Sequence, residues 1–168
     1  MNYLMGTITI DPGWNTALAF WVGDNNPITH VIKEPTKRKK ILVEPRRLKY
    51  MFRKFENILK VYDDELITVY IEGVELWAYN LKSMTAAKRG DLFALAYMVG
   101  GYMAICQKHG YEVKLLYPRG DKKKEKVAWK GQLGPDKLAR RLLRLNGKTY
   151  PEHVREAVAM GFSVMGVL

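Results

Sequence analysis

Short apolar runs dominate the first third of the chain, and turn residues separate them. Residues 4–10, 17–22 and 28–33 are rich in β-branched and aromatic side chains, and a Gly-Asp-Asn-Asn-Pro cluster at 23–27 lies between the second and third runs. We therefore expect three strands that pair as an antiparallel meander.

The apolar period then changes to that of a helix. From about 45 to 62 the apolar side chains recur every three or four residues, as on one face of a helix. The unbroken apolar run at 66–71 instead predicts a strand that is buried on both faces. A long helix is expected from about 83 to 109, with Gly110 as its C-terminal cap.

The last third alternates between strand and helix patterns. It contains an expected strand at 112–117, a lysine-rich loop to about 134, a helix from Pro135 to Leu145 and a final helix from near Pro151. The order β-β-β-α-β-α-β-α-α predicts an α/β fold with a mixed five-stranded sheet flanked by helices. With no repeat or linker, the 168 residues are expected to form one domain, 1–168.

The long helix at 84–110 has two interpretations. Apolar residues at helical spacing are typical of a core helix, but this helix is apolar nearly all round and must bury both sides. That favours a homodimer, in which we expect Met98 and Tyr102 to lie at the interface.

Charge narrows the range of partners. The sequence has 28 Lys and Arg against 17 Asp and Glu, a formal net charge of +11. Such a balance favours polyanions, because basic side chains displace counterions from phosphates. A ribosomal or chromatin-like protein, or a merely solvated basic surface, would share this composition.

Two further observations concern the cell compartment. Cys106 is the only cysteine, which excludes an intramolecular disulfide and a zinc site made of several cysteines. A single cysteine is typical of a reducing compartment, so we expect a cytoplasmic location. No apolar run approaches the ~20 residues that cross a bilayer, so we expect no membrane association.

Three acidic residues and one histidine stand out because they lie at the ends of expected elements. Asp11 closes the first strand, Glu72 closes the strand at 66–71, and His153 and Glu156 share one face of the final helix. Each has a plain structural interpretation: Asp-Pro-Gly is a turn sequence, Glu-Gly is a common strand exit, and the other two suit a helix surface.

Their combination favours a metal site. If the first and fourth strands are neighbours, Asp11 and Glu72 emerge at the same edge of the sheet, where two carboxylates repel unless a cation neutralises them. Divalent cations with oxygen ligands suit this role, and two ions about 3.5–4 Å apart can promote phosphodiester hydrolysis.

Five segments in order resemble the RuvC family of Holliday-junction resolvases, within the RNase H-like superfamily. TITIDPGWNTALAF is similar to the family's first strand and turn, and VYIEGV followed by WAYN is similar to its second acidic motif. AAKRGDLFALAYMVGGYMA resembles the family's long dimer helix, KGQLGPDK its glycine-and-lysine loop, and PEHVREAVAMGFSV its last helix. The resemblance implies an RNase H-like fold and a homodimer. The compact form would suit a bacteriophage gene, whose product would act in the bacterial host cytoplasm.

The resemblance also implies roles for particular residues. Asp11 would bridge two ions, Glu72 and Glu156 would each hold one, and His153 would complete a site or assist the attacking water, with Mg²⁺ as cofactor and Mn²⁺ also active. His153 stands where many members have Asp and some have His, and Glu156 stands where Asp is usual. The product ends would be 5′-phosphate and 3′-hydroxyl.

The resemblance further implies contacts with branched DNA. The family's junction wedge slot holds Glu75 and Leu76, so Trp77 or Tyr79 would serve instead. Phosphate contacts are expected from the basic residues Arg119, Lys122, Lys123, Lys124, Lys130 and Lys137, continued by Arg140, Arg141 and Arg144.

The sequence thus indicates a metal-dependent endonuclease that resolves four-way (Holliday) DNA junctions by paired cuts. Two alternatives remain open at this point. One is an RNase H-like nuclease for other branched or RNA-containing substrates, and the other is a non-catalytic dimer that binds junctions.

Overall fold

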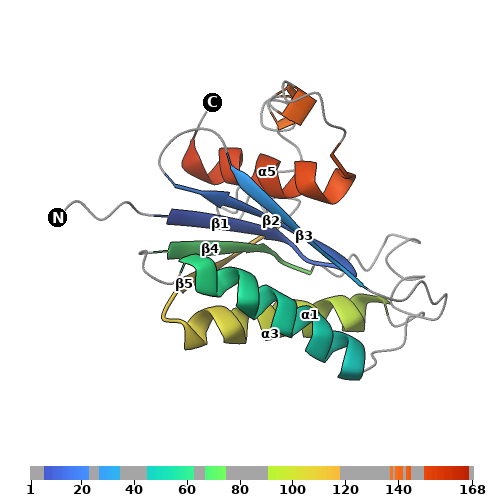
Figure 1. The fold of residues 1–168 in the computed structure, drawn as a ribbon. Coiled ribbons are helices and arrows are strands. Elements are labelled where there is room, and N and C mark those ends of the chain that lie inside the picture. Colours follow the sequence, from blue (N-terminus) through green and yellow to red (C-terminus); the bar gives the residue numbers. More distant parts are fainter. Residues whose placement is uncertain are drawn as a thin grey trace, which may run out of the picture.

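A mixed β-sheet forms the centre of the molecule in the computed structural model (Figure 1). The structure describes residues 6–22, 27–34, 45–62, 67–74, 91–117, 137, 139–141, 143–144 and 150–166. The strands are β1 (Gly6–Asp11), β2 (Asn15–Trp21), β3 (Ile28–Lys33), β4 (Ile67–Glu72) and β5 (Glu112–Leu116). The helices are α1 (Pro45–Leu59), the short 3-10 helix η1 (Lys60–Tyr62), α3 (Asp91–Lys108) and α5 (Glu152–Met165).

The five strands lie in the order β3-β2-β1-β4-β5. Strand β2 pairs antiparallel with both β1 and β3, which confirms the expected meander. Strand β4 runs parallel to β1 on one side and to β5 on the other. The predicted adjacency of the first and fourth strands is therefore confirmed, and their carboxyl ends meet at one edge of the sheet.

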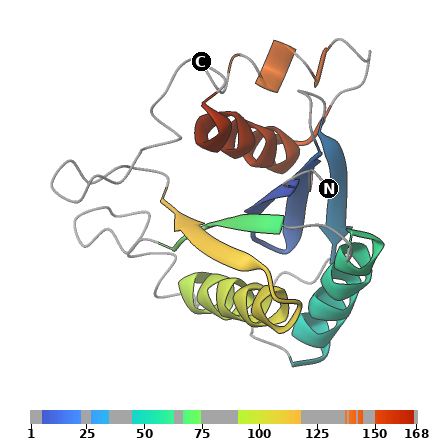
Figure 2. The ribbon, with the colours of Figure 1, turned by 90° about the vertical axis from the view of Figure 1, so that its left-hand side faces the viewer.

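Helices cover both faces of the sheet (Figures 1 and 2). Helices α1 and α3 lie on one face, where Ile8 and Ile10 of β1 and Leu18 and Phe20 of β2 join their core cluster. Helix α5 packs on the other face, against β1 and β2. Alternate residues of a strand point to opposite faces, so a single strand serves both layers.

Small residues bring α5 close to the sheet. Ala17 and Ala19 of β2 lie beneath it, and a Cβ added at Gly161 would come within 2.4 Å of the Trp21 indole. The hydroxyl of Thr9 in β1 donates a hydrogen bond to the Ala157 carbonyl of α5 at 2.6 Å. Together these contacts fix α5 relative to β1.

The predicted helix at 45–62 is confirmed, with its last turn in the 3-10 form. Its apolar side chains Leu48, Met51, Phe55 and Leu59 are buried in the core. Gly110 has a positive φ of 79° just beyond the end of α3, as expected of a C-terminal cap.

The prediction that β4 is buried on both faces is wrong. Ile67, Val69 and Ile71 are buried towards α1 and α3, whereas Thr68, Tyr70 and Glu72 are only partly buried. The reason is the placement of α5, which packs on β1 and β2 and leaves the same face of β4 more open.

The prediction that Met98 and Tyr102 lie at a dimer interface is also wrong. Their exposed fractions are 1% and 0%, because they face the sheet and α1. The outward face of α3 instead carries Phe93 and Tyr97, which are 65% and 63% exposed. Within the described part of the chain, neither α3 nor another helix is long and apolar enough to cross a membrane.

Parts of two predicted helices lie outside the described residues. Positions 83–90 of the long helix are among them, and helix 135–145 is described only in part. The described positions there, 137, 139–141, 143 and 144, are helical.

Candidate metal centre

Asp11 is the last residue of β1, and its side chain is nearly buried. Its exposed fraction is 5%, and Pro12 and Gly13 turn the chain immediately after it into β2. A buried carboxylate is costly to keep charged unless a partner or a cation compensates for its lost hydration. Asp11 therefore needs a neighbour that donates a hydrogen bond, or a bound cation.

Helix α5 supplies that neighbour from its first two turns. His153 and Glu156 are three residues apart and so share one face of the helix. The helix begins after Pro151, whose carbonyl accepts a hydrogen bond from the Val154 amide at 3.1 Å. Because Thr9 and Gly161 fix α5 against β1 and β2, this face is directed at the end of β1.

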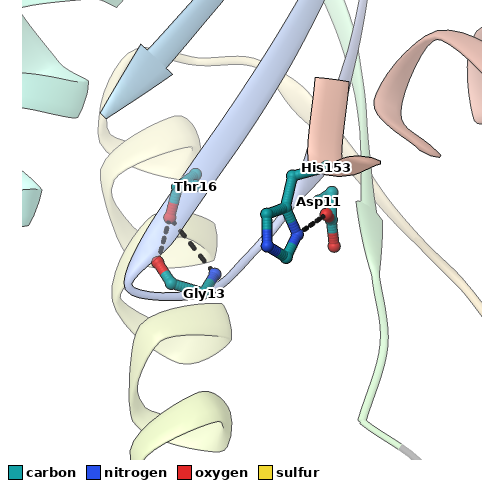
Figure 3. Close-up of polar contacts among 4 residues, drawn as sticks. All are labelled: Asp11, Gly13, Thr16 and His153. Atoms are coloured by element: carbon teal, nitrogen blue, oxygen red, sulfur yellow. Dashed lines mark hydrogen bonds and ion pairs between the residues drawn. The ribbon is translucent and has the colours of Figure 1, made fainter. Parts of the chain in front are cut away.

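His153 and Asp11 point towards one another, as Figure 3 shows. Nδ1 of His153 lies 2.7 Å from Oδ2 of Asp11. This hydrogen bond is the main cause that raises the pKa of His153 above 6.5, partial burial opposes it, and the charges of Asp11, Glu156 and Glu152 add to it. Because a carboxylate has no proton to donate, Nδ1–H of His153 donates to Asp11 in the metal-free protein.

Glu156 completes a compact cluster with these two residues. One ligand atom from each of Asp11, His153 and Glu156 lies within 4.8 Å of the others. Two oxygen donors and one imidazole nitrogen form a donor set that suits Mg²⁺, Mn²⁺ and related divalent cations. The three residues come from positions that lie far apart in the sequence, and the fold brings them together.

Glu72 lies at the same edge of the sheet but outside this cluster. Ile10 of β1 is in register with Ile71 of β4, so Asp11 and Glu72 follow at the carboxyl ends of adjacent parallel strands. Among the described residues, however, the group that could hold one ion contains Asp11, His153 and Glu156 without Glu72.

Most of the DNA contacts expected from the sequence lie outside the described residues. These are Trp77, Tyr79, Arg119, Lys122, Lys123, Lys124 and Lys130. Lys137 is described and exposed, and it lines a surface hollow with Arg140, Arg141 and Arg144. On the opposite side of this short helical segment, Ala139 and Leu143 are buried in the cluster that contains α5.

The sequence analysis missed two buried threonines near the site. Thr9 bonds to the Ala157 carbonyl of α5, and Thr16 bonds to Gly13 in the turn after Asp11 (Figure 3). A threonine in an apolar strand is an ordinary β-former, so nothing in the local pattern distinguishes these two. Their partners become visible only in the folded structure.

No protein-family model matches the chain, and the curated proteins include no match to it. Solved structures do resemble it. "T. thermophilus RuvC in complex with Holliday junction substrate" matches with a TM-score of 0.63 and 16% sequence identity, over 96% of each chain. "Thermus thermophilus RuvC structure" matches with a TM-score of 0.54 and 15% identity, over 96% of this chain and 97% of the other.

At this identity the likeness establishes the fold. The sequence-based expectation of an RNase H-like fold of the RuvC type, with a mixed five-stranded sheet flanked by helices, is confirmed.

Proposed function

We propose that this protein is a divalent-metal-dependent endonuclease that resolves four-way DNA junctions as a homodimer. The observation that carries the proposal is the cluster of Asp11, His153 and Glu156 at the carboxyl edge of the sheet, with Glu72 on the adjacent strand. The structural neighbour in complex with a Holliday junction substrate supports the choice of DNA junctions, and the net charge of +11 supports a phosphate-rich partner.

The geometry of the cluster fits a cation. Two adjacent ligands of octahedral Mg²⁺, each about 2.0–2.1 Å from the metal, lie about 2.9 Å apart, and two opposite ligands about 4.2 Å apart. The 2.7 Å separation of the Asp11 and His153 atoms is close to the first value, and all three ligand atoms lie within 4.8 Å of one another, slightly beyond the second. A cation can therefore take the place of the proton between Asp11 and His153, and only small side-chain movements are needed.

A bound divalent ion supplies an activated water and stabilises the leaving oxygen of a phosphodiester. The residues of the chain provide the setting for this chemistry. Asp11 presents its carboxylate from a rigid strand end, and Glu156 presents a second one from α5. His153 contributes its neutral Nδ1, because protonation would remove the lone pair. Glu72, on the adjacent strand, extends the acidic edge towards β5.

The basic side chains of one helical segment provide phosphate contacts. Lys137, Arg140, Arg141 and Arg144 lie on one exposed face of a helical segment that packs on α5. Such contacts position a duplex without reading its sequence. We assign the same role to Arg119, Lys122, Lys123, Lys124 and Lys130, and junction stacking to Trp77 or Tyr79.

The homodimer is proposed to form through the outward face of α3. Phe93 and Tyr97 lie one helical turn apart and are more than half exposed, and Ala96, Gly100 and Ala104 extend the face with small side chains. A groove between α1 and α3, with Leu48 and Phe52 among its lining residues, adjoins it. A two-fold dimer would place two metal centres on a two-fold junction, so that each cuts one strand.

A substrate panel tests the proposal. The protein is incubated with a synthetic four-way junction, a flap, an RNA–DNA hybrid and linear duplex, each with Mg²⁺, with Mn²⁺ and with EDTA. We expect metal-dependent cleavage of the junction above the other substrates. Asp11→Asn should reduce cleavage to below a few per cent of wild type, at least the roughly 10–100-fold loss that follows even from removing a partner of a ligand, and should leave junction binding intact.

Glu112→Gln is the matched control for Asp11→Asn. Glu112 is an exposed carboxylate at the start of β5, at the opposite edge of the sheet, and this variant should cleave at the wild-type rate. Preferred cleavage of hybrids or flaps would favour another RNase H-like nuclease. Tight junction binding without cleavage in either metal would favour a non-catalytic binding protein.

A further inference from the structure

A buried pair of hydroxyl groups ties α3 to the turn that follows Asp11. Thr16 Oγ1 lies 2.6 Å from the Gly13 carbonyl, and the Gly13 amide donates to the same hydroxyl at 3.2 Å (Figure 3). The Tyr102 hydroxyl of α3 lies 2.8 Å from Thr16 Oγ1. The side chains of Thr16 and Tyr102 are both fully buried, so water does not compete for these bonds.

The bonding capacity of Thr16 determines the direction of each bond. A threonine hydroxyl has one proton to donate and two lone pairs that accept. Its proton must go to the Gly13 carbonyl, because a carbonyl cannot donate. One lone pair accepts the Gly13 amide, so the other accepts the Tyr102 hydroxyl. Burial raises the pKa of Tyr102 to about 12, which keeps this phenol in the donating form.

The same turn is held at a second point. The Trp14 carbonyl accepts a hydrogen bond from the Glu34 amide at 3.0 Å. The Arg47 guanidinium lies 4.1 Å from the centroid of the Trp14 ring and forms an ion pair with Glu34. The turn is thus anchored to the elements on the α1 and α3 face of the sheet.

His153 and Glu156 depend on different contacts. Their helix, α5, is fixed on the opposite face of the sheet through Thr9 and Gly161. Both halves of the cluster thus rest on β1, but only Asp11 leads directly into the turn that Thr16 and Tyr102 hold. A shift of the turn after Asp11 would move its carboxylate relative to the other two ligands without moving α5.

We propose that Tyr102 is a positioning residue that acts through Thr16 to hold the Gly13 turn, and thereby holds the Asp11 carboxylate opposite His153 and Glu156. This inference rests on the proposed function, because that function makes Asp11 a metal ligand. Groups that orient metal ligands typically change metal affinity or activity by 10–100-fold when they are removed.

Variants of the two hydroxyls test the inference through Mn²⁺ affinity, measured by calorimetry on metal-free protein, and through the junction cleavage rate at saturating Mn²⁺. Thr16→Val removes the hydroxyl and nearly keeps the shape, and should weaken Mn²⁺ binding roughly tenfold or more. Tyr102→Phe keeps the ring in the core and should weaken it in the same direction. Thr16→Ser restores the hydroxyl and should bind within about twofold of wild type, well inside that range.

Tyr111→Phe is the matched control. Tyr111 is a buried tyrosine beyond the end of α3, next to the start of β5 and so at the opposite edge of the sheet from Asp11. It should leave Mn²⁺ affinity unchanged even if it lowers the melting temperature. Junction affinity in EDTA should be the same for all five proteins. These hydroxyls do not belong to the basic face, which is the exposed surface formed by Lys137, Arg140, Arg141 and Arg144.

The Asp11→Asn variant distinguishes failure of the positioning role from failure of the metal site. If Asp11→Asn loses Mn²⁺ binding but Thr16→Val and Tyr102→Phe keep the wild-type affinity, the positioning role is refuted and the proposed function stands. If Asp11→Asn binds Mn²⁺ as wild type does, the metal site itself is refuted, and the positioning role with it. Should Thr16→Val fail to fold, Tyr102→Phe alone decides the matter.

Discussion

Nδ1 of His153 and Oδ2 of Asp11 lie 2.7 Å apart, so a proton and a metal ion compete for the same pair of atoms. The hydrogen bond with Asp11 raises the pKa of His153 above 6.5, and a metal ion must displace the proton that this bond holds. Mn²⁺ affinity should therefore weaken as the pH falls through that raised pKa, with the loss beginning above 6.5. Below it, the loss should approach about tenfold per pH unit.

His153→Asp provides the comparison for this pH dependence. A carboxylate at 153 titrates at much lower pH, so this variant should keep its Mn²⁺ affinity down to about pH 5.5. Calorimetric titrations at four pH values measure both proteins. Parallel pH profiles would mean that His153 is not a ligand and that Asp11 and Glu156 act without it.

We predict that a charge introduced on the outward face of α3 dissociates the dimer. Phe93→Glu and Tyr97→Glu should each give monomers in light scattering, because an unpaired carboxylate would be buried in the dimer. Both side chains are more than half exposed in the subunit, so unfolding free energy should change by only about 0.5 kcal/mol. Val61→Glu is the control, since Val61 is 76% exposed but lies outside α3, and this variant should remain dimeric. A wild-type monomer at micromolar concentration would contradict the dimer.

We predict that loss of a basic side chain from the basic face beside α5 reduces the salt dependence of junction binding. Lys137→Gln and Arg144→Gln should each weaken junction binding and reduce the slope of log affinity against log salt by about 0.9 for each phosphate that is no longer neutralised. Lys60→Gln, in η1 and outside this face, should leave the slope unchanged. Binding titrations at five salt concentrations measure the slopes, and equal slopes for all four proteins would mean that this face does not bind the DNA.

We predict that ionisation of the Tyr102 phenol lowers the stability of the fold in alkali. Its pKa is raised from 10.0 to about 12 by burial, so the folded state favours the neutral phenol. The resulting contribution to stability is complete below pH 10 and is lost as the pH rises from 10 to about 12. Over that window the wild type should lose up to about 3 kcal/mol relative to Tyr102→Phe, which has no phenol to ionise. Urea unfolding at pH 9, 10 and 11 measures this difference, and parallel stability curves would contradict the assigned pKa.

Much of the sheet and of the candidate site could be predicted from the sequence because the relevant signals are local. Short apolar runs rich in β-forming residues indicated each strand, and strand ends placed Asp11 and Glu72. The three-residue spacing of His153 and Glu156 placed both on one helical face. The element order then made adjacency of β1 and β4 the natural arrangement.

The errors arose where packing between distant segments decides the outcome. Helix α3 is apolar on all sides, so its pattern could not show that Met98 and Tyr102 face the sheet while Phe93 and Tyr97 face outward. Thr16 and Tyr102 are separated by 86 positions, and neither stands out locally. The partial exposure of β4 likewise depends on where α5 packs.

The most direct test of paired resolution is cleavage of a cruciform extruded from a supercoiled plasmid. A single nick relaxes the plasmid and reabsorbs the cruciform, whereas two cuts made within one complex yield a linear product. We predict that the wild type with Mg²⁺ or Mn²⁺ converts the plasmid mainly to linear DNA, and that Asp11→Asn leaves it supercoiled. Nicked circles as the main product, or the same products from a plasmid without a cruciform, would contradict paired resolution of four-way junctions.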